Sequence, residues 1–267
     1  MFRNKLAIAG AVILIILVIV AIAAPILSPY NPFQQNITQG LSRPSNDHIL
    51  GQDRLGRDIL SRIIYGSRIS LSVGISVVGI SLIVGITIGA LAGFYGGLID
   101  EIFMRIADIL LAFPGILLAI AFTAVMGPDI NNVIIALSLL GWVGYARIVR
   151  GQILYTRELD YVIAAKAIGV TTPYLITFHI LPNIIAPVIV EATFGLAGVI
   201  IAESGLSFLG LGIQPPTPSW GAMLNEGREF ILIAPHLITF PGIAIMLVVM
   251  SINFVGDGLR DMLDVKG

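Results

Sequence analysis

Six apolar segments, each long enough to cross a lipid bilayer as a helix, limit what this chain of 267 residues can fold into. About 20 apolar residues in a helix span the roughly 30 Å hydrocarbon core of a membrane. The mean hydropathy of +0.96 agrees, because soluble domains are far less apolar. The predicted fold class is an all-α integral membrane protein with six transmembrane helices, at residues 6–27, 71–94, 104–126, 133–149, 184–201 and 237–254.

The distribution of Lys and Arg predicts the orientation of these spans. An even number of spans places both termini on one side, and cytoplasmic loops usually carry the excess of positive charge. With both termini inside, nine of the 15 basic residues are cytoplasmic. We therefore expect an N-in, C-in topology with these cytoplasmic charges: Arg3, Lys5, Arg105, Arg147, Arg150, Arg157, Lys166, Arg260 and Lys266.

The chain divides into two expected units. Residues 1–70 contain the first span, which is too long for the apolar part of a signal peptide, and a polar extracytoplasmic loop at 28–70. Residues 71–267 form a five-helix transmembrane domain. Its connections include a second exposed outer loop at 210–235 and a structured cytoplasmic segment at about 150–183.

Small residues and prolines inside the spans predict how the helices pack. Gly85, Gly89 and Gly93 are four residues apart, so they fall on one stripe of a helix and favour close contact with a neighbour. We expect this contact within the chain, with a contact between subunits as the alternative. Prolines within spans bend helices and free backbone groups, so kinks are predicted at Pro114, Pro187 and Pro241.

Three acids within or beside apolar segments are candidates for a translocation pathway or gate: Asp108, Glu191 and Glu203. A charge in the bilayer costs several kcal/mol, about 3 or more, unless it faces a cavity or a partner. We expect Asp108 to pair with Arg105 at a helix end. For Glu191, lining of the pathway and pairing inside the bundle both remain open. For Glu203 we favour a structural or gating role.

The segment between spans four and five has the pattern of two short helices that meet at a corner. Asp160 is a candidate N-cap for a helix over residues 161–168, and Gly169 is suited to the left-handed conformation that ends such a helix. Pro173 favours the first turn of a second helix. Small side chains on the first helix predict a flat surface that another protein can approach, formed by Ala164, Ala165 and Ala167.

This corner resembles the cytoplasmic loop motif of ABC importer permeases. The resemblance rests on Ala164-Ala165, on Gly169 and on Ile180-Leu181-Pro182. Two positions depart from the motif, because Ile163 stands where the family has Glu and His179 replaces a later Ile.

Further segments resemble the "C" permease of dipeptide, oligopeptide or nickel importers, from about residue 48 to 264. One is His-Ile-Leu-Gly-Gln-Asp-Arg-Leu-Gly-Arg-Asp-Ile-Leu-Ser-Arg at 48–62, followed by Tyr-Gly-Ser-Arg at 65–68; the others are 145–151, 206–212, 215–221 and 253–261. The resemblance implies a multi-pass protein of the cytoplasmic membrane that carries di- or oligopeptides, with nickel or a metal chelate as the alternative.

The same resemblance implies the partners and the coupling site. The partners are a homologous second permease, two cytoplasmic ATPase subunits and an extracytoplasmic solute-binding protein. The helix that seats on one ATPase would be formed by Asp160, Tyr161, Ala164, Ala165, Ala167, Ile168 and Gly169.

Several functions are not expected of this chain itself. None of its three lysines stands in the Gly-Lys-Ser/Thr context of a phosphate-binding loop, so ATP and Mg²⁺ are expected on the partner subunits, with no cofactor and no catalysis here. A net charge of −1 gives no general attraction to nucleic acid. The chain has no cysteine, and its three histidines are far apart, so no metal site is expected.

Two other function classes remain to be separated from the importer. A secondary transporter or channel could use the three acids as a relay, but it would not need the cytoplasmic corner. An intramembrane hydrolase could use Ser204 or Ser207 as a nucleophile, although no histidine lies within a predicted span. Dependence of uptake on ATP distinguishes these classes.

Overall fold

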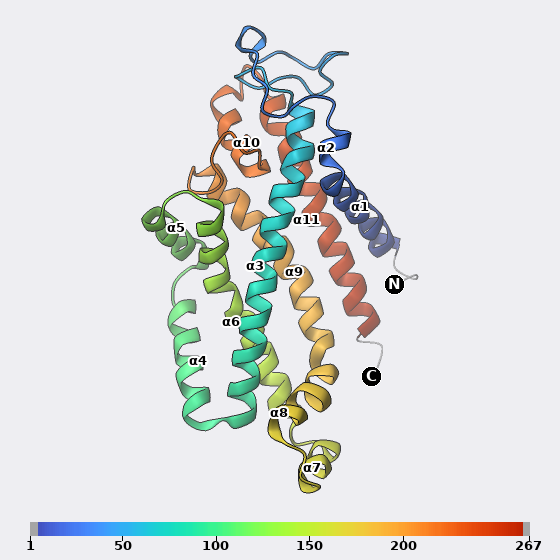
Figure 1. Ribbon diagram of the computed structural model, residues 1–267, viewed down its shortest axis with the longest axis vertical. Coiled ribbons are helices and arrows are strands. Elements are labelled where there is room, and N and C mark those ends of the chain that lie inside the picture. Colours follow the sequence, from blue (N-terminus) through green and yellow to red (C-terminus); the bar gives the residue numbers. More distant parts are fainter. Residues whose placement is uncertain (1–4, 264–267) are drawn as a thin grey trace.

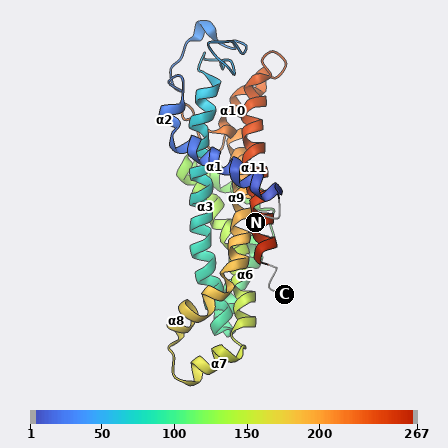
Figure 2. The same ribbon diagram turned by 90° about the vertical axis from the view of Figure 1, so that its right-hand side faces the viewer.

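The computed structural model describes residues 5–263, and this part of the chain is helical without β-strands. It is an elongated bundle with the loop before α3 at one end and α7 at the other (Figures 1 and 2). Arg3 and Lys266, two of the charges used to predict the orientation, lie outside the described residues. The helices are α1 (Lys5–Ile22), α2 (Ala24–Leu27), α3 (Ile59–Tyr95), α4 (Gly97–Leu111), α5 (Gly115–Met126), α6 (Ile130–Thr156), α7 (Asp160–Ala167), α8 (Thr172–Tyr174), α9 (Leu181–Phe208), α10 (Trp220–Gly227) and α11 (His236–Leu263).

Five helical segments in the described part are long and apolar enough to cross a membrane. They are α1, α3, α6, α11 and the continuous helical run Thr172–Phe208, in which a π-helical segment at Leu175–Ile180 joins α8 to α9. The sixth is the pair α4 and α5, which qualifies only when its two members are counted together. The predicted membrane helices are thus present, and the third span differs from a straight helix.

The predicted third span, residues 104–126, is broken in the middle. α4 ends before Ala112 and Pro114 is the N-cap of α5, with an angle of 86° between the two helices. Proline lacks the N–H that would continue the hydrogen-bond ladder and its ring clashes with the preceding turn. The kink predicted at Pro114 is confirmed, and it is a full break. Pro187 and Pro241, by contrast, lie inside α9 and α11, which continue through them.

The outer loop is shorter and better ordered than the sequence suggested. α3 begins at Ile59, twelve residues before the predicted start of the second span, and runs to Tyr95. Asp58 caps this helix, because its carboxylate accepts hydrogen bonds from the Ser61 N–H at 2.8 Å and the Ser61 hydroxyl at 2.7 Å. The expectation that residues 28–70 form a wholly exposed loop is therefore wrong.

The centre of the bundle is a close contact between α3 and α6. A β-carbon built on Gly89 would lie 2.5 Å from the Ala146 carbonyl oxygen, and one built on Gly85 would lie 2.5 Å from the Tyr145 β-carbon. The glycine stripe thus lets the backbone of α6 approach α3 directly. This confirms the predicted role of the stripe in packing within the chain.

A matched pair of glycines on α3 tests this contact. We expect Gly89→Ala to lower the free energy of unfolding by about 1–3 kcal/mol, because the new methyl group overlaps the backbone of α6. Gly79→Ala on the same helix is the control: a β-carbon at Gly79 would have no atom within 4 Å, so stability should stay the same or rise slightly. Unfolding in mixed detergent–SDS micelles measures both, and equal stability of the two variants would contradict the packing role.

Candidate functional site

The cytoplasmic corner predicted from the sequence is present between α6 and α9. α7 ends at Ala167, and Gly169 two residues later has a φ of +88°, the left-handed conformation that was predicted for it. The Gly169 N–H bonds the Lys166 carbonyl at 3.1 Å and the Val170 N–H bonds the Ala165 carbonyl at 3.2 Å. This pair of bonds is the Schellman arrangement that terminates a helix in a defined direction. The chain then turns into α8, whose second residue is Pro173.

One detail of the corner differs from the prediction. Asp160 is the first residue of α7 rather than its cap, and the cap position is Leu159, which offers no side-chain hydrogen bond. The carboxylate of Asp160 therefore lies in the first turn, where it interacts favourably with the positive end of the helix dipole. Its proposed capping role is wrong, while its place at the start of α7 is as expected.

The outward surface of α7 is more apolar and less flat than the alanines suggested. Ala164 and Ala167 are exposed, but Ala165 is only 8% exposed and packs inward, so its predicted place on the exposed surface is wrong. Large apolar side chains surround the exposed alanines. Tyr161, Ile163 and Ile168 are 41%, 52% and 83% exposed. A tip of this composition outside the membrane suits a protein contact.

The inward surface of α7 connects it to the long helices. Val162 and Ala165 are buried in one core cluster with Leu175 and Ile180, which lead into α9. At the other end of the corner, the Arg157 guanidinium donates to the Gly93 carbonyl at 2.9 Å and so joins the end of α6 to the end of α3. α7 is therefore packed against the segment that leads into α9, while the end of α6 is tied to α3.

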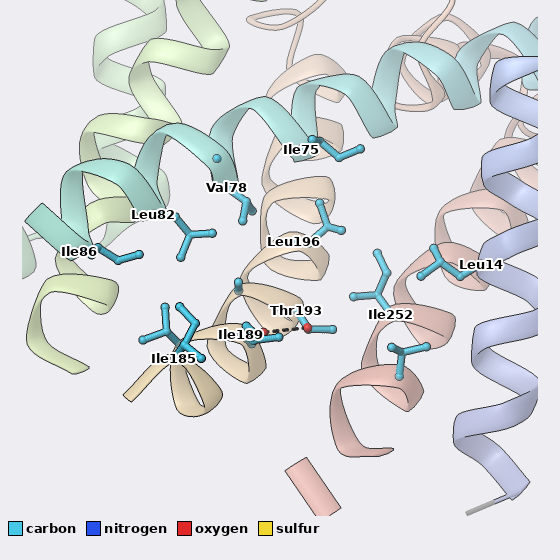
Figure 3. Close-up of a pocket in the computed structure, with 14 residues that line it drawn as sticks. Leu14, Ile75, Val78, Leu82, Ile86, Ile185, Ile189, Thr193, Leu196 and Ile252 are labelled. Atoms are coloured by element: carbon cyan, nitrogen blue, oxygen red, sulfur yellow. Dashed lines mark hydrogen bonds between the residues drawn. The ribbon is translucent and has the colours of Figure 1, made fainter. Parts of the chain in front are cut away.

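Two cavities lie beside different faces of α9 in the membrane-spanning region, and Val78 of α3 lines both. The first, of about 460 Å³, is lined almost wholly by aliphatic side chains from α1, α3, α9 and α11 (Figure 3). Its single hydroxyl belongs to Thr193, and this group already donates to the Ile189 carbonyl at 2.9 Å. Such a lining leaves no free polar group for a hydrophilic solute.

The second cavity, of about 290 Å³, lies between α9, α6, α5 and α3 and contains Glu191. Glu191, Gly195, Gly198 and Ala202 recur at helical spacing, so they form one face of α9. The side chain of Tyr145 enters from α6. Of the two possibilities left open by the sequence, the structure places Glu191 at a cavity, since none of the described residues forms a hydrogen bond or an ion pair with its carboxylate.

Asp108 has a different partner from the one expected. Its carboxylate forms an ion pair with Arg147 of α6 at 2.5 Å, and both side chains are about half exposed. Nearby, Asp100 forms a two-pronged pair with Arg150, of which one bond measures 2.6 Å. The predicted pair with Arg105 is wrong because α4 lies alongside α6, and the arginines of α6 face its carboxylates.

Glu203 lies in a closed polar cluster. Its side chain is fully buried and accepts hydrogen bonds from the hydroxyls of Ser207, at 2.8 Å, and Ser204, at 3.5 Å. Ser70 of α3 and Ser219, the cap of α10, complete the set of donors. The carboxylate thus ties three elements together near the outer end of the bundle. A gating role for Glu203 stays a prediction.

Comparison with known proteins agrees with this geometry. Residues 85–266 match the family model described as binding-protein-dependent transport system inner membrane component, and residues 1–44 match the N-terminal TM domain of oligopeptide transport permease C. The chain belongs to this family of ABC importer permeases. The resemblance inferred from the sequence motifs is confirmed, and the permease is a multi-pass protein of the cytoplasmic membrane.

Individual relatives are similar to the permease over nearly its whole length. It is 47% identical to a dipeptide transport system permease protein of Alkalihalophilus pseudofirmus, covering 99% of this chain and 87% of the relative. It is 45% identical to a glutathione transport system permease protein of Pectobacterium atrosepticum, covering 99% and 88%. Among solved structures, the inward-facing MetNI methionine ABC transporter matches 77% of this chain and 97% of its own, with a TM-score of 0.59 at 18% identity, which supports the fold.

The outer end of the permease contains a buried ion-pair cluster that the sequence did not reveal. Asp53, Arg57 and Arg62 come from the start of α3 and the loop before it, and Glu226 comes from α10. Arg57 bonds Asp53 and Glu226, each at 2.6 Å, and Arg62 bonds Glu226 at 3.1 Å and Asp53 more closely still. Both arginines are 1% exposed. The predicted N-in, C-in topology leaves Arg57 and Arg62 on the extracytoplasmic side, and in the structure both are paired within the fold.

Removal of one carboxylate from this cluster should be strongly destabilising. Glu226→Ala leaves two buried guanidinium groups with a single acid, so we expect a loss of about 3–5 kcal/mol in the free energy of unfolding. Glu229→Ala, three residues away and exposed, should change stability by less than about 0.5 kcal/mol. Thermal unfolding of the purified permease in detergent compares them, and a Glu226→Ala variant as stable as Glu229→Ala would refute the role of the cluster.

Proposed function

We propose that this permease subunit carries di- and oligopeptides across the cytoplasmic membrane. The observation that supports this cargo is the high identity, over 99% of the chain, to permeases named for dipeptide and glutathione transport. These solutes share a peptide backbone. The chain would form half of the pathway, and a homologous second permease would form the other half.

In this proposal the chain is a non-catalytic subunit. ATP and Mg²⁺ bind to two cytoplasmic ATPase subunits, and a separate solute-binding protein delivers the peptide to the outer end. That end presents the loop before α3 and the α10 region, whose ion-pair cluster gives a firm surface for docking. With both termini inside, α7 lies in the cytoplasm, at the end of the bundle opposite this surface (Figure 1).

Coupling would pass through α7. Its exposed apolar tip, with Tyr161, Ile163 and Ile168, seats in a groove of one ATPase. Ile163 replaces the usual acid of the motif, so we expect an apolar contact at this point of the groove. When ATP draws the two ATPases together, the movement reaches α9 through the buried contacts of Val162 and Ala165.

The cavity beside Glu191 is the part of this chain that we assign to the pathway. Its carboxylate has no partner among the described residues, whereas Asp108 is paired with Arg147 and Glu203 accepts hydrogen bonds from serine hydroxyls. A charged group at this depth is stable when it faces water or a solute.

The first test is uptake by the complete transporter, reconstituted into proteoliposomes with its second permease, ATPases and binding protein. We expect accumulation of radiolabelled alanyl-alanine that requires ATP on the ATPase side and stops when ADP replaces it. Uptake without ATP would favour a secondary transporter or channel. Accumulation of nickel, with none of the peptide, would support the metal alternative instead.

The second test uses the absence of native cysteines. A cysteine at exposed Ala164 should react with a membrane-impermeant maleimide in inverted vesicles and become protected when the ATPases bind. Two matched controls frame the result: Ala165→Cys is buried one residue away and should react slowly, and Gln35→Cys in the outer loop should react only in right-side-out vesicles. Labelling of Ala164→Cys that the ATPases do not change would sink the coupling assignment, and the reverse sidedness would overturn the orientation.

A further inference from the structure

We infer that the cavity beside Glu191 binds the protonated amino group at the N-terminus of the transported peptide. This inference rests on the proposed function, since it assigns one chemical group of the cargo to one site in the pathway. It is carried by three oxygen-bearing side chains that meet in this cavity without hydrogen-bond partners among the described residues: Glu191, Tyr145 and Ser81.

The three groups come from three helices and converge on one space. Tyr145 reaches across from α6 so closely that a β-carbon on Gly195 of α9 would lie 2.3 Å from its hydroxyl oxygen. Glu191 is one helical turn from Gly195 on the same face. A β-carbon built on Gly144 of α6 would lie 3.8 Å from its carboxylate oxygen, in van der Waals contact. The phenol and the carboxylate therefore occupy the same part of the cavity.

Ser81 contributes the third oxygen from α3. Its side chain is 1% exposed, and its hydroxyl has no hydrogen-bond partner in the described chain. It lies against α6, where a β-carbon on Gly141 would be 2.4 Å from the hydroxyl oxygen, and it lines the cavity. A buried hydroxyl without a partner is uncommon in native proteins, because its desolvation is not offset. Because this oxygen is shielded from solvent against α6, a ligand would reach it once the Ser81 side chain turns into the cavity.

The charge and the donor count of the site match a primary ammonium group. An ammonium has three N–H donors and no acceptor, and the cavity offers a carboxylate and two neutral hydroxyl oxygens. One carboxylate neutralises one positive charge, so a divalent metal ion would keep an excess charge in the bilayer. Charge-assisted hydrogen bonds of this kind are about twice as strong as neutral ones.

The remaining lining leaves room for different side chains. Gly115, Gly141, Gly144, Gly195 and Gly198 contribute no side-chain bulk to the wall. The other cavity beside α9, which shares Val78 with this one, has aliphatic walls and no free polar group (Figure 3). Of the two cavities beside α9, the one that contains Glu191 therefore has the free oxygen acceptors that an ammonium site requires.

A protection experiment on the wild-type transporter tests the assignment directly. Dicyclohexylcarbodiimide, an apolar carboxyl reagent, should modify Glu191 in the complete reconstituted transporter, as measured by mass spectrometry. At a peptide concentration about four times its Kd, we expect alanyl-alanine to slow this reaction about fivefold, because only the unoccupied carboxylate reacts. N-acetyl-alanyl-alanine, which lacks the charged amine, should leave the reaction unchanged. Equal protection by both peptides, protection by neither, or no reaction of Glu191 would each overturn the inference.

Variants of α9 provide an independent readout. Glu191→Gln should lower the amount of alanyl-alanine transported per ATP hydrolysed about tenfold or more, the factor expected for loss of a hydrogen bond to a charged group. Glu191→Asp keeps the charge and should retain more transport than Glu191→Gln. Thr193→Val, on the opposite face of the helix, is the control and should transport like the wild type. Identical behaviour of the Asp and Gln variants would contradict recognition of charge.

The two proposals fail in different ways. A wild-type transporter that takes up no peptide contradicts the proposed function. A wild-type transporter that takes up alanyl-alanine with ATP, but shows no amine-dependent protection of Glu191, contradicts the ammonium site alone.

Discussion

The close contact between α3 and α6 is the constraint on which the rest of the permease depends. Lipid tails are as apolar as leucine, so membrane helices gain little from burying leucine against leucine and must instead pack closely. Gly85 and Gly89 allow this on α3, and the backbone of α6 fits against them. With one face of α6 held there, Gly144 and the hydroxyl of Tyr145 lie towards α9. The contact between α3 and α6 therefore sets the position of the α6 side chains that line the cavity.

The two ends of the bundle are held by different kinds of interaction, which suits different tasks. At the outer end, buried ion pairs join the start of α3 to α10, and such pairs require a narrow range of geometry. At the cytoplasmic end, α7 is joined to the beginning of α9 by aliphatic packing and by a wide π-helical turn at Leu175–Ile180. A π-helical turn is a local departure that often accompanies function. Ion pairs at one end and an aliphatic corner at the other suit the proposed importer, in which α7 receives the movement of the ATPases.

The sequence predicted features that depend on local backbone chemistry or on runs of apolar residues. It located the apolar spans, the break at Pro114, the glycine contact and the left-handed Gly169. It did not predict the pairing of Asp108 with Arg147 or the cluster around Arg57 and Arg62, because these pairs join distant parts of the chain. The exposure of Ala165 was predicted wrongly for a similar reason. The side of α7 that is buried depends on how the segment leading into α9 packs against it. Ser81 carried no signal beyond being a polar residue in an apolar run, and Tyr145 was noted only as the first residue of the motif at 145–151, with no role attached to it.

A peptide transporter must recognise solutes whose side chains differ, and this limits where specific contacts can be placed. Strong contacts to side chains would exclude part of the cargo, whereas the terminal amine is common to all unmodified peptides. A pathway also needs binding that is favourable enough for entry and weak enough for release. One carboxylate with two hydroxyls, beside a wall of glycines, meets both requirements: it holds the shared charge and makes few contacts with anything else. Charge recognition and tolerance of side chains thus follow from the same face of α9.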